Sequence, residues 1–386
     1  ANTMSQWIGT RFKNKYYQFF FAIIAMLLIS FIVLINVGLT QVISKSLDTD
    51  PFYVLLAITV FVFGYMMFGG ANSMLYTNTI QALIMVVVAL MIIFSGVDLF
   101  EGGVSGFTAK LNAIDPNLTK TFNESSPLYR DFFEVVICQA IVGVAIVCQP
   151  HIMTKSLMLK NPEKVNSYLF FAIGSMTIFF LIVIAGLYAR IMFPDLTVDG
   201  NKMKMDEIIP VYVVKRFSVA AGILVVVGLI SAGLSTLEGL IQSLSITVTS
   251  DILEPVFGEK ITKNGLVINK VVIVLLAVVS FYFSWNQMKE PNLSVGIFGQ
   301  NGVYGYFAAA FVPVLFGTFV KNVKSSTVFA ASVVAIVVHF GIFYLKLTPY
   351  MQGTVGNPGV SAAIAICSSL FVAIILHTFN KDKEVA

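Results

Sequence analysis

Residues 229–251 read L-I-S-A-G-L-S-T-L-E-G-L-I-Q-S-L-S-I-T-V-T-S-D, an apolar run that continues a predicted membrane-crossing helix from Val219. The run also holds many polar side chains, namely Ser231, Ser235, Thr236, Glu238, Gln242, Ser243, Ser245, Thr247 and Thr249. A helix that faces only lipid does not keep so many polar groups, because each of them needs a partner or a watery cavity. The stretch therefore predicts a helix that borders a polar site inside a membrane protein.

Three positions on this helix form a face that carries oxygen atoms. Ala232, Ser235 and Thr236 are spaced i, i+3 and i+4, so one backbone carbonyl and two hydroxyls converge. Oxygen ligands without thiolate or imidazole suit a hard cation. Small and hydroxylated residues also line ordinary helix contacts in membranes, so this stretch alone leaves both interpretations open.

Composition places the chain among all-α polytopic membrane proteins. Hydrophobic residues make up 57% of its 386 residues and charged residues 11%, whereas soluble domains have roughly 25% charged residues. The net charge of +4 is spread over the loops and forms no basic patch for nucleic acid. The lipid bilayer is therefore the expected surrounding of the chain.

Apolar runs of about 20 residues predict about ten membrane-crossing helices. They lie near residues 17–43, 52–68, 73–99, 132–148, 168–191, 218–249, 265–285, 295–320, 327–345 and 360–379. Two long loops separate some of them, at residues 101–130 and 193–216. The second loop is expected to fold a short amphipathic helix from Met205 to Val214.

Lysine and arginine in the short loops predict the orientation. One side collects Arg11, Lys13, Lys15, Lys155, Lys160, Lys164, Lys260, Lys263, Lys270, Lys321, Lys324, Lys381 and Lys383. The short loops of the other side hold only Lys45, Lys289 and Lys346. Because basic residues gather in cytoplasmic loops, both ends of the chain are expected in the cytoplasm, which an even number of crossings allows.

The third predicted helix starts with a polar stretch. Gly69 and Gly70 are expected to form a tight cytoplasmic turn, after which Thr77, Asn78 and Gln81 enter the bilayer on nearly one face.

The fourth predicted helix ends at V-C-Q-P-H-I-M-T-K, where Pro150 removes a backbone donor and frees a carbonyl near Ile146. Gln149 and His151 therefore lie either at a break inside the membrane or at the cytoplasmic end of the helix. The nearby Lys155 favours the second interpretation.

The eighth predicted helix is rich in glycine around Gln300 and Asn301 and carries Pro313. Helices that are interrupted by glycine or proline, with polar groups at membrane depth, are typical of the binding region of secondary transporters. We therefore expect an interruption of this helix near Gln300.

The sequence does not favour an enzyme. It has no H-E-x-x-H, no G-x-S-x-G and no glycine-rich phosphate loop, and His151, His339 and His377 lack metal-ligand spacing. A channel would need a pore-lining ring, and the sequence has no filter-like loop.

Four motifs in order resemble the sodium:solute symporter family. They are G-G-x-x-x-x-x-Y-T-N-T-I-Q at residues 69–81, Q-P-H-I at 149–152, S-A-G-L-S-T at 231–236 with S-D-I from 250, and G-Y-F-A-A-A-F-V-P-V-L at 305–315. The likeness covers essentially the whole chain, and Q-P-H-I is most similar to the branch of proline and pantothenate transporters.

The resemblance implies a LeuT-type fold, in which two inverted five-helix repeats surround a site at the membrane midplane. The match begins at the family's fourth helix, and the chain starts at Ala1 in a charged segment that looks like the middle of a loop. We therefore expect a single transport domain over residues 1–386 that lacks the first three helices. Residues 17–99 would be the remnant of the first repeat, 132–320 the second repeat, and 327–379 additional C-terminal helices.

The resemblance also implies a ligand set for sodium (Na+). The carbonyl of Ala232 and the hydroxyls of Ser235 and Thr236 match the family's sodium ligands, while the missing first repeat helix would supply further backbone oxygens. Many family members have aspartate at the position of Asn78, where it helps to hold a second sodium ion. The asparagine here puts a second ion in doubt.

Glu238 departs from the family's S-T-A-D-S pattern, because the acid here is one methylene longer than aspartate. It could serve as a coupling group if it faces the cavity, or it could be a charge that neighbouring hydroxyls satisfy. The sequence leaves the two roles open.

By the family pattern, the residues from Gln139 to Ala145 are expected to face the solute cavity. Gln300 and Asn301 are expected to face it as well. Gln149 and His151 are expected at the inner mouth.

These observations predict a sodium-coupled symporter of a small organic solute, such as an amino acid or a carboxylate, in the cytoplasmic membrane. Two alternatives remain from the sequence, a symporter-like sensor domain of a signalling protein and a remnant that does not transport.

Overall fold

The computed structural model describes residues 3–68, 71–150, 152, 161–198, 200–258, 261, 263–289, 294–353 and 355–385. Within these residues, eight helices are long and apolar enough to cross a membrane, and two shorter apolar helices at Pro51–Met66 and Phe133–Cys148 accompany them. The ten segments coincide with the ten predicted crossings. Gly69, Gly70 and His151, for which the sequence predicts a turn and a position at the inner mouth, lie outside the described residues.

The N-terminal part of the chain forms five helices. They are α1 (Met4–Arg11), α2 (Lys15–Ala25), α3 (Ile29–Leu47), α4 (Pro51–Met66) and α5 (Ala71–Phe94), with the 3-10 turn η1 (Met26–Leu28) joining α2 to α3. Local capping explains two of the starts. The Asn14 side chain accepts the N–H of Tyr17 before α2, and Asp50 accepts the N–H of Phe52 before α4, where Pro51 occupies the first helical position.

The middle of the chain alternates membrane helices with surface elements. The elements are η2 (Val97–Phe100), α6 (Gly103–Ile114), η3 (Pro116–Thr119), the π-helix η4 (Phe133–Cys138), α7 (Gln139–Ala145), η5 (Ile146–Cys148), η6 (Pro162–Lys164), α9 (Val165–Leu181), η7 (Ile182–Ile184), α10 (Ala185–Met192), β1 (Thr197–Val198), β2 (Asn201–Lys202), η8 (Met205–Glu207) and α11 (Ile208–Arg216). The amphipathic helix expected from Met205 to Val214 is confirmed by η8 and α11. Helix α6 lies in the first long loop and was not expected, although Val104, Phe107 and Leu111 recur at helical spacing and the last two are buried.

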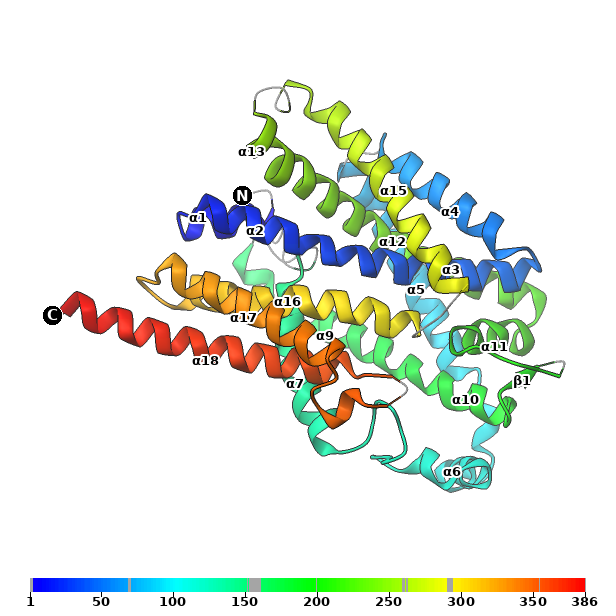
Figure 1. Cartoon of the computed structure of the whole chain (residues 1–386). Coiled ribbons are helices and arrows are strands. Elements are labelled where there is room, and N and C mark those ends of the chain that lie inside the picture. Colours follow the sequence, from blue (N-terminus) through cyan, green and yellow to red (C-terminus); the bar gives the residue numbers. More distant parts are fainter. Residues whose placement is uncertain are drawn as a thin grey trace.

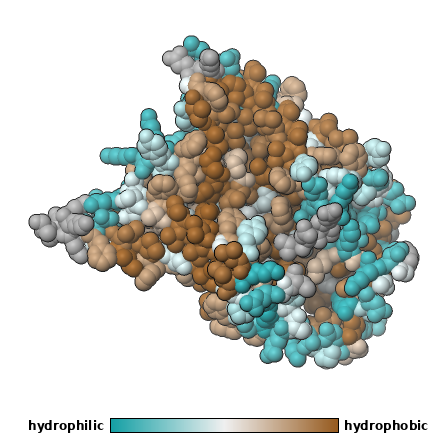
Figure 2. Space-filling view, viewed as in Figure 1, coloured by the Kyte–Doolittle hydropathy of each residue, from teal (hydrophilic) through white to brown (hydrophobic). Residues whose placement is uncertain are grey.

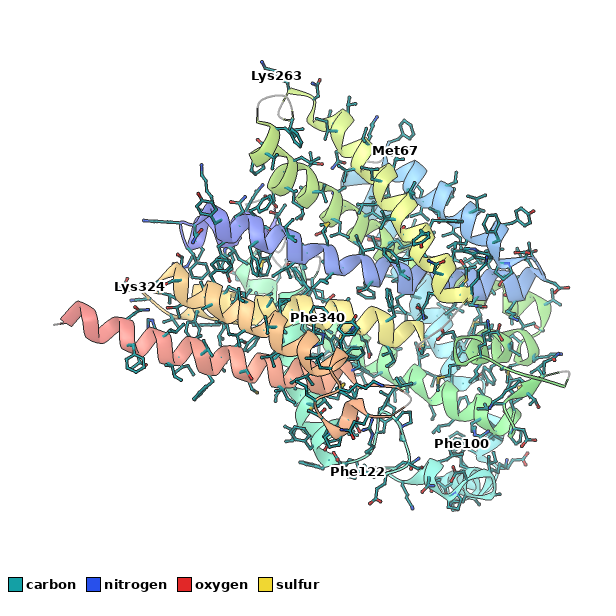
Figure 3. The ribbon with its side chains drawn as sticks, in the orientation of Figure 1. Met67, Phe100, Phe122, Lys263, Lys324 and Phe340 are labelled. Carbon is teal, nitrogen blue, oxygen red and sulfur yellow. The ribbon has the colours of Figure 1, made fainter. Side chains whose placement is uncertain are left out.

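The C-terminal part holds the longest helices. They are α12 (Val219–Ile246), the π-helix η9 (Thr247–Leu253), α13 (Glu254–Phe257), α15 (Gly265–Lys289), α16 (Val295–Phe319), α17 (Ser325–Tyr344) and α18 (Pro358–Val385), with η10 (Pro349–Met351) between the last two. Figure 1 shows these helices running roughly side by side, with both chain ends at the same end of the bundle. Figure 3 places Lys263 and Lys324 at that end, and Phe100 and Phe122 at the other.

Helix α16 forms the centre of the bundle and packs against α3, α17 and α18. The interruption expected near Gln300 is wrong, because α16 is continuous from Val295 to Phe319 and includes Pro313. Its glycines serve close packing instead. A Cβ atom at Gly299 would lie 2.9 Å from Leu34 Cβ, and one at Gly302 would lie 2.7 Å from the carbonyl oxygen of Leu27. The absence of a side chain therefore lets two helices approach without breaking either of them.

The surface has the polarity of a membrane protein. Figure 2 shows apolar side chains over the middle of the visible face and hydrophilic ones gathered toward the ends of the helices. Large apolar side chains on α4, α9 and α15, such as Val60, Phe170 and Leu275, are strongly exposed. Such side chains are expected where lipid replaces water as the solvent.

Candidate functional site

Helix α12 brings the three predicted cation ligands together. The hydroxyl of Ser235 donates to the carbonyl oxygen of Ala232 at 3.0 Å, and the hydroxyl of Thr236 donates to the same oxygen at 3.1 Å. All three residues are half-buried. Because each hydroxyl uses its hydrogen in this bond, the lone pairs of both hydroxyls stay available to a cation beside the Ala232 carbonyl.

Neighbouring helices pack closely around this part of α12. A Cβ atom at Gly228 would lie 2.5 Å from Val88 of α5, and one at Gly233 would lie 2.6 Å from Leu39 of α3. Ala232 and Ser235 lie one and two turns from Gly228, on the side that faces α5. The half-buried oxygen atoms therefore lie on a side of α12 that neighbouring helices approach closely.

Helix α5 adds amide oxygens near the same level. Helices α5 and α12 are the third and the sixth apolar segment of the chain, so they run in opposite directions across the membrane. Val88 of α5 lies beside Gly228 of α12. Gln81, seven residues before Val88, is therefore level with Ser235, seven residues after Gly228. Neither Gln81 Oε1 nor Asn78 Oδ1 has a hydrogen-bond partner among the described residues, although both atoms are buried. Buried acceptors without a donor favour a cation or a water molecule between the two helices.

The donor set is neutral and consists of oxygen. Among the described residues no group of three His, Cys, Asp or Glu side chains is placed to hold a metal ion together. Carbonyl, hydroxyl and amide oxygens are the ligands of hard cations. The chemistry of Ala232, Ser235 and Thr236 therefore fits a sodium ion.

Glu238 faces a different neighbour. Its side chain is 4% exposed, and its Oε1 accepts a hydrogen bond of 2.5 Å from the Tyr65 hydroxyl of α4. Its Oε2 is buried without a partner among the described residues. The carboxylate thus lies between α12 and α4, whereas the hydroxyls of Ser235 and Thr236 turn back to Ala232.

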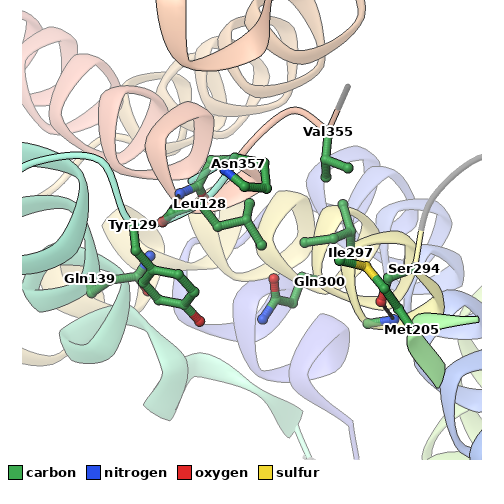
Figure 4. Close-up of a pocket in the computed structure, with 11 residues that line it drawn as sticks. Leu128, Tyr129, Gln139, Met205, Ser294, Ile297, Gln300, Val355 and Asn357 are labelled. Atoms are coloured by element: carbon green, nitrogen blue, oxygen red, sulfur yellow. Dashed lines mark hydrogen bonds between the residues drawn. The ribbon is translucent and has the colours of Figure 1, made fainter. Parts of the chain in front are cut away.

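A cavity of about 320 Å³ brings together two of the predicted solute contacts. Its walls are Pro127, Leu128, Tyr129, Gln139, Met205, Ser294, Gly296, Ile297, Gln300, Val355 and Asn357. Figure 4 shows the amide of Gln300 in the space between Tyr129 and Ile297, with Gln139 on the far side of Tyr129. The two glutamines come from α7 and α16, which are distant in the sequence.

The other predicted contacts do not line this cavity. Asn301 turns to α17, where its Nδ2 donates to the Tyr344 hydroxyl at 3.2 Å and its carbonyl oxygen is 2.9 Å from His339 Nε2. Gln149 is 3% exposed at the end of η5, with its Oε1 unpartnered among the described residues. Extended backbone at Gln149 follows the 3-10 turn, so regular helix ends at Cys148.

The start of α18 closes one side of the cavity, which the sequence did not indicate. Asn357 Nδ2 donates to Glu134 Oε1 at 2.9 Å, and the N–H of Gly359 donates to Asn357 Oδ1 at 2.8 Å. A Cβ atom at Gly359 would lie 2.6 Å from Gln139 Nε2. The dipeptide Asn357-Pro358 does signal a helix start, but nothing local indicates that it borders a cavity.

A polar network at the rim connects the loop before η4 to η10. The Arg130 guanidinium donates to the carbonyls of Ser126 and Tyr350, and the Tyr350 hydroxyl donates to Asp131 at 2.7 Å. Hydrogen bonds from the Glu134 N–H and from Tyr350 lower the pKa of Asp131. The same bond to Asp131 raises the pKa of Tyr350 to about 12.

Comparison with known proteins gives one family and several relatives. The model of the sodium:solute symporter family matches residues 1–335. A sodium/pantothenate symporter of Haemophilus influenzae is 27% identical over 259 residues, which are 64% of this chain and 50% of that protein. Sodium/proline symporter 2 of Staphylococcus saprophyticus is 22% identical over 358 residues, which are 86% of this chain and 65% of that protein. The chain thus spans between half and two thirds of the length of these relatives.

A solved structure shares the fold. It is the substrate-bound outward-open state of a Na+-coupled sialic acid symporter, with a TM-score of 0.68 and 17% sequence identity. The match covers 97% of this chain and 77% of that one. This similarity confirms the LeuT-type architecture that the sequence motifs predict.

Proposed function

Because this chain belongs to the sodium:solute symporter family, we propose that it is the transport domain of a sodium-coupled symporter for a small organic solute. The convergence of the Ala232 carbonyl and the Ser235 and Thr236 hydroxyls supports this function most directly. The solutes named for the two relatives, proline and pantothenate, both carry a carboxylate. The proposed solute is an amino acid such as proline, or another carboxylate.

Sodium couples to the solute by joining two elements that move relative to each other. Ala232, Ser235 and Thr236 supply one half of the coordination shell from α12, and the family's broken first repeat helix supplies the other half. Sodium binds better when α12 and the broken helix are close together, and this is the state that also binds the solute. Bound sodium therefore raises the affinity for the solute, and bound solute raises the affinity for sodium by the same factor. The downhill entry of sodium then drives the cycle between outward and inward states.

The solute occupies the cavity that Gln139 and Gln300 border. A glutamine amide both donates and accepts hydrogen bonds, so the pair recognises a carboxylate and a neighbouring polar group. Gln149 belongs to the inner mouth, where the sequence also predicts His151, which lies outside the described residues. Asn301 joins α16 to α17 through its bond to Tyr344. Asn78 and Glu238 remain candidates for coupling, since each carries a buried oxygen without a partner among the described residues.

The protein lies in the cytoplasmic membrane with both ends of this chain in the cytoplasm. The excess of lysine and arginine in the loops near Arg11, Lys263 and Lys324 supports this orientation. Residues 17–99 belong to the first repeat and residues 132–320 to the second. The helices over residues 327–379 are additional to the repeats.

Uptake into liposomes that contain the full-length protein tests the function. Labelled proline, pantothenate, acetate and a sugar are supplied with and without a sodium gradient. Ser235→Ala and Thr236→Ala each remove one ligand, which is expected to raise the sodium concentration for half-maximal uptake roughly ten- to hundredfold, in line with about 1.5–3 kcal/mol for a bond to a charged group.

Ser245→Ala is the matched control. The Ser245 hydroxyl also donates to a carbonyl of α12, at 3.2 Å from Gln242, but it lies outside the ligand set. Uptake that does not depend on the sodium gradient contradicts the proposal. Equal effects of Ser235→Ala, Thr236→Ala and Ser245→Ala on uptake contradict it as well. Sodium binding without uptake of any solute would instead identify a sensor.

A further inference from the structure

A second pocket lies apart from the solute cavity and has a different chemistry. It has a volume of about 160 Å³ and is lined by Gln41, Lys45, Pro51, Lys204, Glu207, Trp285, Met288 and Lys289. These residues come from α3, α4, η8 and its flank, and the end of α15. No lining residue is shared with the solute cavity. We call this site the lysine pocket.

The lysine pocket has an excess of positive charge. Three of its lining side chains are lysines and one is a glutamate, so the formal charge is 3 − 1 = +2. Lys45 Nζ pairs with Glu207 Oε1 at 3.3 Å, which neutralises one lysine. Asp206, next to Glu207 in the sequence, is directed away, because its carboxylate accepts from Ser294 Oγ and from the N–H of Val295. Glu290, which follows Lys289 in the sequence, lies outside the described residues. The charges of Lys204 and Lys289 remain without a carboxylate among the described residues.

These two lysines are held at the pocket by contacts that leave their charge available. Lys204 Nζ donates to the carbonyl oxygen of Met288 at 3.4 Å. Lys289 Nζ lies 4.9 Å from the centre of the Trp285 ring. An ammonium group has three donors, so each lysine keeps hydrogens for a further acceptor.

Gln41 provides a second, independent indication of a ligand. Its side chain is only 7% exposed, it lines the pocket, and its Oε1 has no hydrogen-bond partner among the described residues. A buried amide without a partner costs free energy unless a ligand or a water molecule meets it. The NH2 group of the same amide can donate to an anion in the pocket.

We propose that the lysine pocket binds a small anion, of the size of chloride or a short carboxylate. Lys204 and Lys289 supply the charge, Gln41 supplies a neutral donor, and Trp285, Met288 and Pro51 form the apolar wall. The bound anion fastens η8 to the ends of α3 and α15. Because Met205 of η8 lines the solute cavity and Asp206 holds the start of α16, the anion stabilises the wall between the two sites. This site does not depend on the proposed transport of a solute.

Trp285 is a built-in reporter for the experiment. The full-length protein in nanodiscs of zwitterionic lipid is titrated with sodium chloride or sodium acetate in exchange for sodium gluconate, so that the sodium concentration is constant. The difference between the wild-type protein and Trp285→Phe isolates the fluorescence of Trp285. We expect a saturable change with chloride or acetate. Lys204→Gln and Lys289→Gln are each expected to raise the apparent Kd roughly tenfold, as for the loss of one charged hydrogen bond.

Lys202→Gln is the matched control, because Lys202 is an exposed lysine of the adjacent β2 strand that does not line the pocket. It should leave the titration unchanged. Thermal unfolding provides a second readout, in which chloride or acetate raises the Tm of the wild-type protein and of Lys202→Gln but not of the Lys204→Gln/Lys289→Gln double variant.

Three results would overturn the proposal. The first is a linear fluorescence change without saturation, which indicates collision. The second is an equal response of Lys202→Gln and Lys204→Gln. The third is a response that follows the content of anionic lipid at constant chloride, which would assign the pocket to a lipid phosphate.

Discussion

At the scale of single residues, Glu238 is a carboxylate inside the bundle whose described partner is the Tyr65 hydroxyl. Tyr65→Phe leaves both carboxylate oxygens buried without a partner, and this is expected to destabilise the protein by about 1–3 kcal/mol. Thermal unfolding in detergent measures the effect. Tyr53→Phe on the same helix is the control, because Tyr53 is 66% exposed.

Glu238→Gln separates charge from hydrogen bonding in this pair. The amide keeps the hydrogen bond to Tyr65 and removes the charge, so a coupling role predicts lower sodium-dependent uptake with unchanged Tm. If uptake is unchanged while Tyr65→Phe lowers the Tm, Glu238 has a structural role only.

Asp131 gives a pH dependence whose sign follows from its pKa. Hydrogen bonds from the Glu134 N–H and from Tyr350 lower the pKa in the folded state. The ionised Asp131 carboxylate therefore stabilises the folded protein fully at a pH above its ordinary pKa of about 4. This stabilisation is lost as the pH falls through the lowered pKa of the folded state. Tyr350→Phe removes one of these bonds and raises the pKa of Asp131 in the folded state toward its ordinary value, so acid should lower the Tm by less than in the wild-type protein. A Tm profile below pH 6 that is identical for both proteins would contradict this.

At the scale of elements, the contact between α16 and the α2–α3 segment depends on glycine. A Cβ atom at Gly302 would collide with Ser30 and would lie 2.7 Å from the backbone oxygen of Leu27, which cannot move aside like a flexible side chain. Gly302→Ala is expected to cost about 1–3 kcal/mol, as overpacking of an interior does. Gly341→Ala on α17, where no atom lies within 4 Å, is the control. Equal Tm values for the two variants would show that the helices can separate at little cost.

At the scale of the whole molecule, the orientation can be tested at the two ends of α17. Lys324 precedes this helix and Lys346 follows it, so the two lie on opposite sides of the membrane. In a background without cysteine, a membrane-impermeant thiol reagent added to intact cells should label Lys346→Cys and spare Lys324→Cys. The reverse pattern would invert the proposed topology.

The sequence by itself determined the apolar segments and the face of α12 that carries three neighbouring oxygen atoms. Both are local properties, since a run of apolar residues long enough to span a bilayer and the 3.6-residue period of a helix depend only on neighbours in the chain. The spacing of Ala232, Ser235 and Thr236 therefore placed their oxygens together before any tertiary contact was known.

Only the tertiary structure decided how the helices meet. The glycines of α16 looked like an interruption in the sequence, whereas in the structure they accommodate Leu34 and Ser30 from a helix more than 260 residues earlier. Asn357 reaches Glu134 across 223 positions, and Lys204 and Lys289 meet at one pocket. Contacts of this kind depend on the packing of whole helices against one another, and no local pattern of residues records which surfaces will face each other.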